Sequence, residues 1–350
     1  MNELIKRLRA VFYENKIPGP YKIELWPTQL CNLNCKYCRP ENYVPDKKEI
    51  SDKRLLELID EAASLDVKEV IIAGGGEPLV RKEIVMKIME RIKEKNMKGS
   101  LTTNGVLLNK EDVKGIVGIN WDNLFFSIDG PNESYNDELR KKGSFRKAVE
   151  NIGFLNHFKK KLSSKRPSLG ISMVLTRTNY KALFEMFELA KKLKIDCLVV
   201  NPIKGNNTEY NERLKLRTGD IEILRKELPK IRKYADKNKI QNTLDTLDTD
   251  LVEKSSDRIQ LMDVSFFCFE PFTSVLINSF GGIGPCCERP DDYNQDSILN
   301  KSLKEVWYGE YFREIRNKNY KNKKCFYCNA WKITDTCNIQ SLFRKNERKN

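Results

Sequence analysis

The sequence has very little histidine and no long hydrophobic run. Its 350 residues contain one histidine, His157, which argues against a metal centre built on histidine ligands. No apolar stretch is long enough to span a bilayer and no signal peptide opens the chain, so we expect a soluble, cytoplasmic protein without a membrane span. The ten cysteines are therefore expected to bind metal and not to form disulfides.

The charge balance is strongly basic. A formal net charge of +14 would suit an anionic partner such as nucleic acid. However, lysine is spread over the predicted helices beside glutamate, and the densest basic stretch, residues 313–324, contains no nucleic-acid-binding motif. We therefore expect no nucleic-acid partner, and a metal-bearing nucleic-acid-binding protein is kept as the alternative from a different class.

Predicted strands and helices alternate over the first two thirds of the chain, and amphipathic helical stretches separate the strands. Six strand-then-helix units in order imply a parallel sheet with right-handed crossovers. Ligands of such a sheet gather at the carboxyl ends of its strands. The predicted strands are residues 21–28, 67–73, 98–103, 123–128, 169–176 and 196–201.

Three cysteines follow the first predicted strand in the pattern Cys-x3-Cys-x2-Cys, at Cys31, Cys35 and Cys38. Three thiolates can hold three corners of an iron–sulfur cubane and leave the fourth iron open to a ligand with an amine and a carboxylate. Spacing alone leaves three alternatives, namely a zinc site, a disulfide knot and thiols that only pack in a core. Zinc sites usually combine two separated pairs of ligands, which this triplet does not resemble.

A glycine run follows the second predicted strand, from Gly74 through Gly76, and leads into Glu77 and Pro78. Glycine lets the backbone approach a ligand closely and turn its polar groups inward. The run therefore suits a polar cradle at the end of a strand, although an ordinary turn before a helix gives the same pattern.

Together these two motifs resemble the radical S-adenosylmethionine (SAM) superfamily, whose cysteine loop follows the first barrel strand and whose Gly-Gly-Glu-Pro segment follows the second. The resemblance implies an α/β fold, an incomplete (β/α)6 barrel that carries a [4Fe–4S] cluster with SAM chelated at its unique iron. Reductive cleavage of SAM would release a 5′-deoxyadenosyl radical, with the electron supplied by a flavodoxin- or ferredoxin-type donor. The matching residues are Cys31, Cys35 and Cys38 for the cluster and Gly75, Gly76, Glu77 and Pro78 for SAM.

Further polar residues close the later predicted strands, and the resemblance implies that such residues contact SAM. We expect polar contacts from Thr103, Asn104, Ser127 and Asp129, and a carboxylate partner in Arg177. Each of these residues would also serve as an ordinary turn or cap residue.

Six further cysteines lie in the C-terminal part of the chain. Their layout fits a zinc knuckle or a second cluster, and it resembles the SPASM and twitch extensions of radical SAM enzymes. The resemblance implies one auxiliary [4Fe–4S] cluster that transfers electrons. Its expected ligands are Cys268, Cys287, Cys325 and Cys328, with Cys286 and Cys337 as alternates.

The expected organisation has four parts. An N-terminal helix lies in residues 1–20, the partial barrel spans 21–240, a linker spans 241–260, and a small α+β cluster-binding extension spans 261–350.

The expected reaction is abstraction of a hydrogen atom from an unactivated C–H bond by an oxidoreductase or epimerase. A sugar or aminocyclitol is the preferred substrate, because few residues precede the first strand to form a leader-binding domain. A ribosomal peptide, crosslinked or epimerised, is the alternative. Cys197 is a candidate hydrogen donor, although a buried thiol that packs among its neighbours is the ordinary interpretation.

Overall fold

Nine strands form one sheet in the computed structural model, which describes residues 3–14, 16–38, 48–203, 209–245, 247, 268–286 and 297–322. The strand order is β7-β6-β5-β4-β3-β2-β1-β8-β9. All neighbours are parallel except β8 and β9, which are antiparallel. The strands are β1 Lys22–Leu25, β2 Glu69–Ile72, β3 Lys98–Thr103, β4 Asn123–Ser127, β5 Ser168–Leu175, β6 Cys197–Pro202, β7 Gln241–Asn242, β8 Ser274–Ile277 and β9 Ile283–Gly284.

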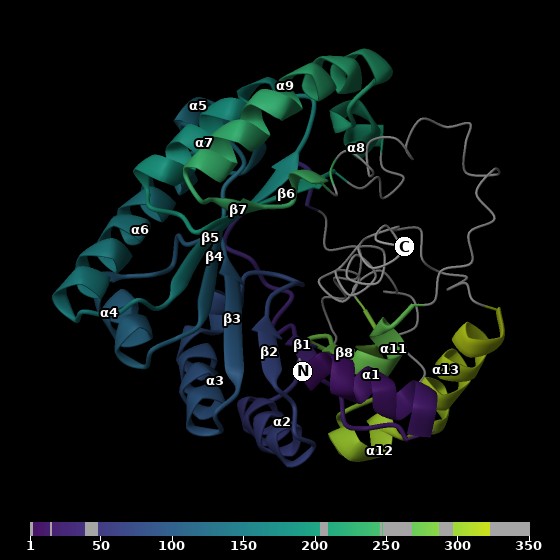
Figure 1. The fold of residues 1–350 in the computed structure, drawn as a ribbon. Coiled ribbons are helices and arrows are strands. Elements are labelled where there is room, and N and C mark those ends of the chain that lie inside the picture. Colours follow the sequence, from purple (N-terminus) through teal and green to yellow (C-terminus); the bar gives the residue numbers. More distant parts are fainter. Residues whose placement is uncertain are drawn as a thin grey trace.

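Helices cover the outer face of this curved sheet (Figure 1). In β1, Ile23 and Leu25 are fully buried in the core that the helices share, whereas Lys22 and Glu24 on the other face are partly exposed. The alternation follows from the period of two along a strand. The covering helices are α2 Asp52–Ser64, η1 Pro78–Arg81, α3 Lys82–Glu94, α4 Lys110–Gly118, α6 Ser144–Lys161, η2 Tyr180–Ala182, α7 Leu183–Lys192 and α9 Thr218–Lys237. Two short helices, α5 Glu133–Leu139 and α8 Glu209–Leu214, contribute Leu139 and Leu214 to a separate buried cluster.

The sheet does not close on itself, because β7 and β9 are its two edges among the described residues. The predicted incomplete barrel of the α/β class is confirmed. No helix in the described ranges is long and apolar enough to cross a membrane.

The C-terminal extension joins the barrel more closely than a linked domain would. Strand β8 pairs in parallel with β1, so the barrel sheet continues directly into the extension. The segment expected to be a linker opens with β7, which pairs with β6, and Leu244 and Leu247 just after it are fully buried. The two edge strands, β7 and β9, have two residues each and are shorter than the strands between them.

The remaining helices of the described ranges lie on the same side of the molecule as the extension (Figure 1). The indole Nε1 of Trp307 donates a hydrogen bond of 2.8 Å to the carbonyl of Pro18, which ties the extension to the N-terminal segment. These helices are α1 Glu3–Glu14, α11 Glu270–Thr273, α12 Leu303–Trp307 and α13 Glu310–Asn322. Two of these helices, α12 and α13, are separated only by Tyr308 and Gly309.

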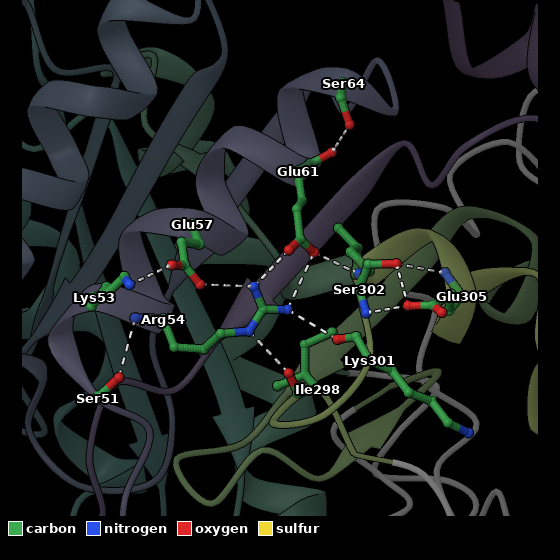
Figure 2. A network of polar contacts seen from close by, with 11 residues as sticks. Ser51, Lys53, Arg54, Glu57, Glu61, Ser64, Ile298, Lys301, Ser302 and Glu305 are labelled. Atoms are coloured by element: carbon green, nitrogen blue, oxygen red, sulfur yellow. Dashed lines mark hydrogen bonds and ion pairs between the residues drawn. The ribbon is translucent and has the colours of Figure 1, made fainter.

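Arg54 on α2 fastens the extension to the barrel (Figure 2). Its guanidinium donates hydrogen bonds of 3.0 Å to the carbonyls of Ile298 and Lys301 and forms an ion pair with Glu61. Glu61 in turn accepts a hydrogen bond of 2.6 Å from the amide of Leu303, the first residue of α12. One barrel helix thus holds the extension through its backbone.

Candidate functional site

The cysteine loop and the glycine segment lie in direct contact at the carboxyl end of β1 and β2. The amide of Gly76 donates to the carbonyl of Thr28, and the amide of Glu77 donates to the carbonyl of Leu30, each at 2.8 Å. The segment that leads into Cys31 is therefore joined to the glycine segment by two backbone hydrogen bonds.

Two of the glycines are required by this close approach. A Cβ at Gly76 would lie 1.9 Å from the Leu30 carbonyl oxygen. A Cβ at Gly75 would lie 2.6 Å from the Thr28 oxygen, and Gly75 also has a φ of +59°, a left-handed conformation that favours glycine. The polar cradle predicted from the sequence is thus first of all a backbone contact between the two motifs.

Glu77 joins the glycine segment to the end of β3. Its carboxylate is buried and accepts hydrogen bonds from Thr103 Oγ1 at 2.6 Å, from the Asn104 amide at 2.7 Å and from the Leu79 amide at 3.1 Å. Burial raises the pKa of Glu77, and these hydrogen bonds oppose that rise by stabilising the carboxylate. The Glu77 carboxylate and the Thr103 hydroxyl are therefore engaged with each other by a hydrogen bond.

Asn104 connects the same strand end to the cysteine loop. Its Nδ2 donates a hydrogen bond of 2.8 Å to Asn32 Oδ1, and its Oδ1 accepts one of 3.0 Å from the amide of Val106. Asn32 lies between Cys31 and Cys35, so the bond restrains the loop from the side of β3.

Asp129 is fully buried just beyond β4, and protein donors occupy both of its oxygens. Oδ1 accepts a hydrogen bond of 2.8 Å from the Val174 amide. Oδ2 accepts one of 2.5 Å from the Tyr37 hydroxyl and lies 2.6 Å from Arg140 Nε in an ion pair. Tyr37 and Arg140 were not among the predicted site residues, because nothing in the sequence links either to Asp129.

Ser127 and Arg177 lie in different surroundings. Ser127 ends β4, where it pairs with Ser172 of β5, and its hydroxyl has no hydrogen-bond partner within the described ranges. The Arg177 side chain forms an ion pair of 3.0 Å with Asp220. The Ser127 hydroxyl is therefore free, whereas the Nε of Arg177 is already engaged by Asp220.

Cys197 begins β6 and pairs with Gly170 and Gln241. The cluster loop lies at the carboxyl end of the sheet, whereas Cys197 lies at the amino end of its strand. At about 3.3 Å per residue, the length of β6 separates the two edges.

The three loop cysteines differ in exposure. Cys31 and Cys38 are exposed and Cys35 is partly buried. Burial raises the pKa of the Cys35 thiol to about 11, against the lowering effect of Arg140, and the negative charges of Cys38 and Cys31 also raise it. For each of the three thiols, burial raises the pKa and the Arg140 charge lowers it.

The donor set suits a cluster better than a single ion. Within the described ranges, no three His, Cys, Asp or Glu side chains are arranged to hold one metal ion, whereas a cubane takes each thiolate on a separate iron. Binding of iron would deprotonate the thiols despite their raised pKa values. Of the expected auxiliary ligands, Cys268 lies within the described residues, as does the alternate Cys286. Cys287, Cys325, Cys328 and Cys337 lie outside them.

An open parallel barrel with a three-cysteine loop paired to a glycine turn defines an enzyme class that binds an iron–sulfur cluster at the carboxyl edge of its sheet. Residues 27–190 match the radical SAM superfamily. Residues 268–329 match SPASM, an iron–sulfur cluster-binding domain. The chain belongs to the radical SAM superfamily and is an enzyme that binds a [4Fe–4S] cluster and SAM in the barrel and an auxiliary iron–sulfur cluster in the SPASM domain.

Relatives of named function span different parts of the chain. A tungsten-containing aldehyde ferredoxin oxidoreductase cofactor-modifying protein of Pyrococcus furiosus is 23% identical over 336 residues, which are 89% of this chain and 87% of that protein. The mycofactocin maturase MftC of Mycolicibacterium smegmatis is 29% identical over 180 residues, which are 51% of this chain and 44% of that protein.

Among solved structures, Streptococcus suis SuiB bound to its precursor peptide SuiA has the same fold. It superposes with a TM-score of 0.67 at 21% identity and covers 89% of this chain and 70% of SuiB.

Proposed function

We propose that this enzyme abstracts a hydrogen atom from an unactivated C–H bond of a ribosomally made peptide and oxidises that peptide. The radical-generating part rests on one observation, the pairing of residues 28–30 with the glycine segment. The peptide part is supported by the similarity to a maturase. The sugar or aminocyclitol preferred from the sequence has no support among the relatives.

In this proposal, each part of the site has one task. Cys31, Cys35 and Cys38 hold three irons and leave the fourth for SAM. When bound, the cluster and SAM supply an electron and a 5′-deoxyadenosyl radical that takes the hydrogen atom. Ser127 offers a free hydroxyl to SAM, and Glu77 keeps the glycine segment against β3.

Electron flow completes the proposed reaction. A flavodoxin- or ferredoxin-type protein would supply the first electron, and an auxiliary cluster in the SPASM domain would supply an acceptor for the electron that remains when the substrate radical loses a proton. The position of Cys197 at the amino end of β6 argues against direct hydrogen donation to a radical at the opposite edge.

Modification of an enzyme cofactor is the second candidate. It is favoured by the similarity to the cofactor-modifying protein, which covers 89% of this chain and so includes the extension as well as the barrel.

Deuterium transfer distinguishes the two candidates. The reconstituted enzyme is incubated with SAM, dithionite and a short peptide encoded beside its gene, deuterated at the carbons under test. We expect deuterium in 5′-deoxyadenosine and a loss of two hydrogens from the peptide, neither of which occurs with Cys35→Ala. Deuterium transfer from a cofactor precursor, with none from the peptide, would overturn the peptide proposal in favour of the second candidate.

A further inference from the structure

A buried ion pair lies directly behind the cluster loop. Arg140 Nε and Asp129 Oδ2 are 2.6 Å apart, and the exposed fractions of their side chains are 8% and 0%. Removing two charges from water is costly, and the cost is recovered only where the pair has good geometry and further hydrogen bonds. A buried pair at this position therefore calls for a reason beyond stability.

The pair contacts the loop at the residues between Cys35 and Cys38. The Tyr37 hydroxyl donates to Asp129, and the Arg140 guanidinium carbon lies 5.8 Å from the centre of the Tyr37 ring. The amide of Lys36 donates a hydrogen bond of 2.8 Å to the carbonyl of Leu139, the residue before Arg140. Side-chain and backbone contacts thus hold this stretch of the loop from one side.

The rest of the structure fixes the pair itself. Asp129 Oδ1 accepts from the Val174 amide, its own amide donates to Asn136 Oδ1 at 2.9 Å, and its carbonyl accepts from Asn179 Nδ2 at 2.7 Å. These contacts come from α5, β5 and the turn after β5. Asp129 is therefore held in place, and both of its carboxylate oxygens already have protein partners.

We propose that Asp129 and Arg140 are positioning residues for the cluster loop, and that their opposite charges shift the reduction potential of the SAM-binding cluster in opposite directions. In this proposal Asp129 acts on the cysteine loop through its contacts with Tyr37 and Arg140. This role replaces the contact with SAM that was expected from the sequence. The inference concerns the cofactor and does not depend on the identity of the substrate.

The sign of each effect follows from the charges. A reduced cluster carries one more negative charge than an oxidised one, so a nearby cation favours reduction and a nearby anion opposes it. Loss of the arginine charge should therefore lower the potential, and loss of the aspartate charge should raise it.

The experiment measures the midpoint potential of the cluster whose electron paramagnetic resonance signal changes on addition of SAM. We expect a more negative potential for Arg140→Gln, a less negative one for Asp129→Asn, and a value near that of the wild type for Arg140→Lys, which keeps the charge. Tyr37→Phe removes a hydroxyl without changing charge, so it should leave the potential in place.

Arg7→Gln is the matched control. Arg7 is also buried, with 6% of its side chain exposed, forms an ion pair of 2.7 Å with Asp66 and lies over a tyrosine ring, that of Tyr21, at 6.0 Å. It lies at the amino end of the sheet, away from the cysteine loop. Loss of this pair should destabilise the fold without shifting the potential.

Hydrogen–deuterium exchange of the metal-free protein tests the anchoring separately. The Lys36 amide should exchange several-fold faster in Tyr37→Phe and Asp129→Asn than in the wild type, and at the wild-type rate in Arg7→Gln. Shifts of the same sign in Arg140→Gln and Asp129→Asn, or shifts no larger than that of Arg7→Gln, would overturn the proposal. Unchanged exchange at Lys36 would do the same for the anchoring role.

Discussion

Asn104 Nδ2 and Asn32 Oδ1 are joined by a hydrogen bond of 2.8 Å. This contact links two parts of the chain separated by 72 residues, one at the end of β3 and the other inside the cysteine loop. With the Glu77 hydrogen bonds, it makes the carboxyl ends of β1, β2 and β3 a single polar unit around the site where the cluster binds.

Asn104→Ala removes the bonds to Asn32 and Val106. Because Asn104 is buried, we expect a loss of about 1–2 kcal/mol in the free energy of unfolding of the metal-free protein and less iron bound per chain after reconstitution. Asn109→Ala is the control, because it removes the N-cap of α4, which costs a similar 0.5–2 kcal/mol or so. Equal iron loading in both variants would contradict a role for Asn104 in holding the loop.

Gly76→Ala tests the close approach of the two motifs. The added methyl would meet the Leu30 carbonyl, so the paired segments must separate, and we expect a loss of about 3 kcal/mol or more in unfolding free energy together with loss of iron binding. In Gly153→Ala, within α6, the Cβ meets nothing within 4 Å. That variant should gain about 0.5–1 kcal/mol, as measured by denaturant titration. A Gly76→Ala protein as stable as the wild type would show that the pairing is dispensable.

Arg54→Ala should loosen the extension. It removes hydrogen bonds to Ile298 and Lys301 and leaves Glu61 without its cation, so limited proteolysis should cut residues 297–322 several-fold faster. Lys53→Ala changes the neighbouring residue, whose side chain is 88% exposed and reaches Glu57 at only 3.8 Å. Such a pair contributes about 0–1 kcal/mol, so cleavage should stay at the wild-type rate. Equal rates for both variants would argue against the Arg54 clamp.

Asp137 makes the free energy of unfolding depend on pH. Burial raises the pKa of its carboxyl, but hydrogen bonds from Asn136, Phe145, Gly143 and Ser144 outweigh burial and lower the pKa below its ordinary value of 3.8. A lowered pKa in the folded state stabilises the protein above the unfolded value, and that stabilisation disappears as the pH falls through the folded value.

Asp137→Asn should therefore cost about 1–3 kcal/mol near pH 7, measured by denaturant unfolding. The difference from the wild type should shrink as the pH falls below about 4. A difference that stays constant down to pH 2 or so would assign the effect to packing and not to charge.

Local sequence patterns predicted most of the barrel. The strand predicted at residues 98–103 coincides with β3, and the strand predicted at 123–128 differs from β4 by one residue. Hydrophobic periodicity and capping residues such as Ser51 are local signals, so one sequence is enough to read them. The cysteine and glycine motifs could be placed at the ends of strands for the same reason.

Contacts between distant residues could not be predicted in this way. Tyr37 and Asp129 are 92 residues apart, and Arg140 lies in a charged stretch that resembles any solvent-exposed turn. The pairing of β8 with β1 was missed because both strands are short and one sequence contains no signal of register. These long-range contacts determine which polar side chains at the barrel rim are already occupied, as in Asp129, and which remain free, as in Ser127.

The central claim is that Cys31, Cys35 and Cys38 hold a cluster whose open iron binds SAM beside Gly75 and Gly76. Its most direct test is the 5′-deoxyadenosine formed when the anaerobically reconstituted protein is reduced with dithionite in the presence of SAM. We predict steady formation by the wild type and none above background by Cys35→Ala, while the variant keeps the iron of its auxiliary cluster. Equal formation by the two proteins would contradict the account.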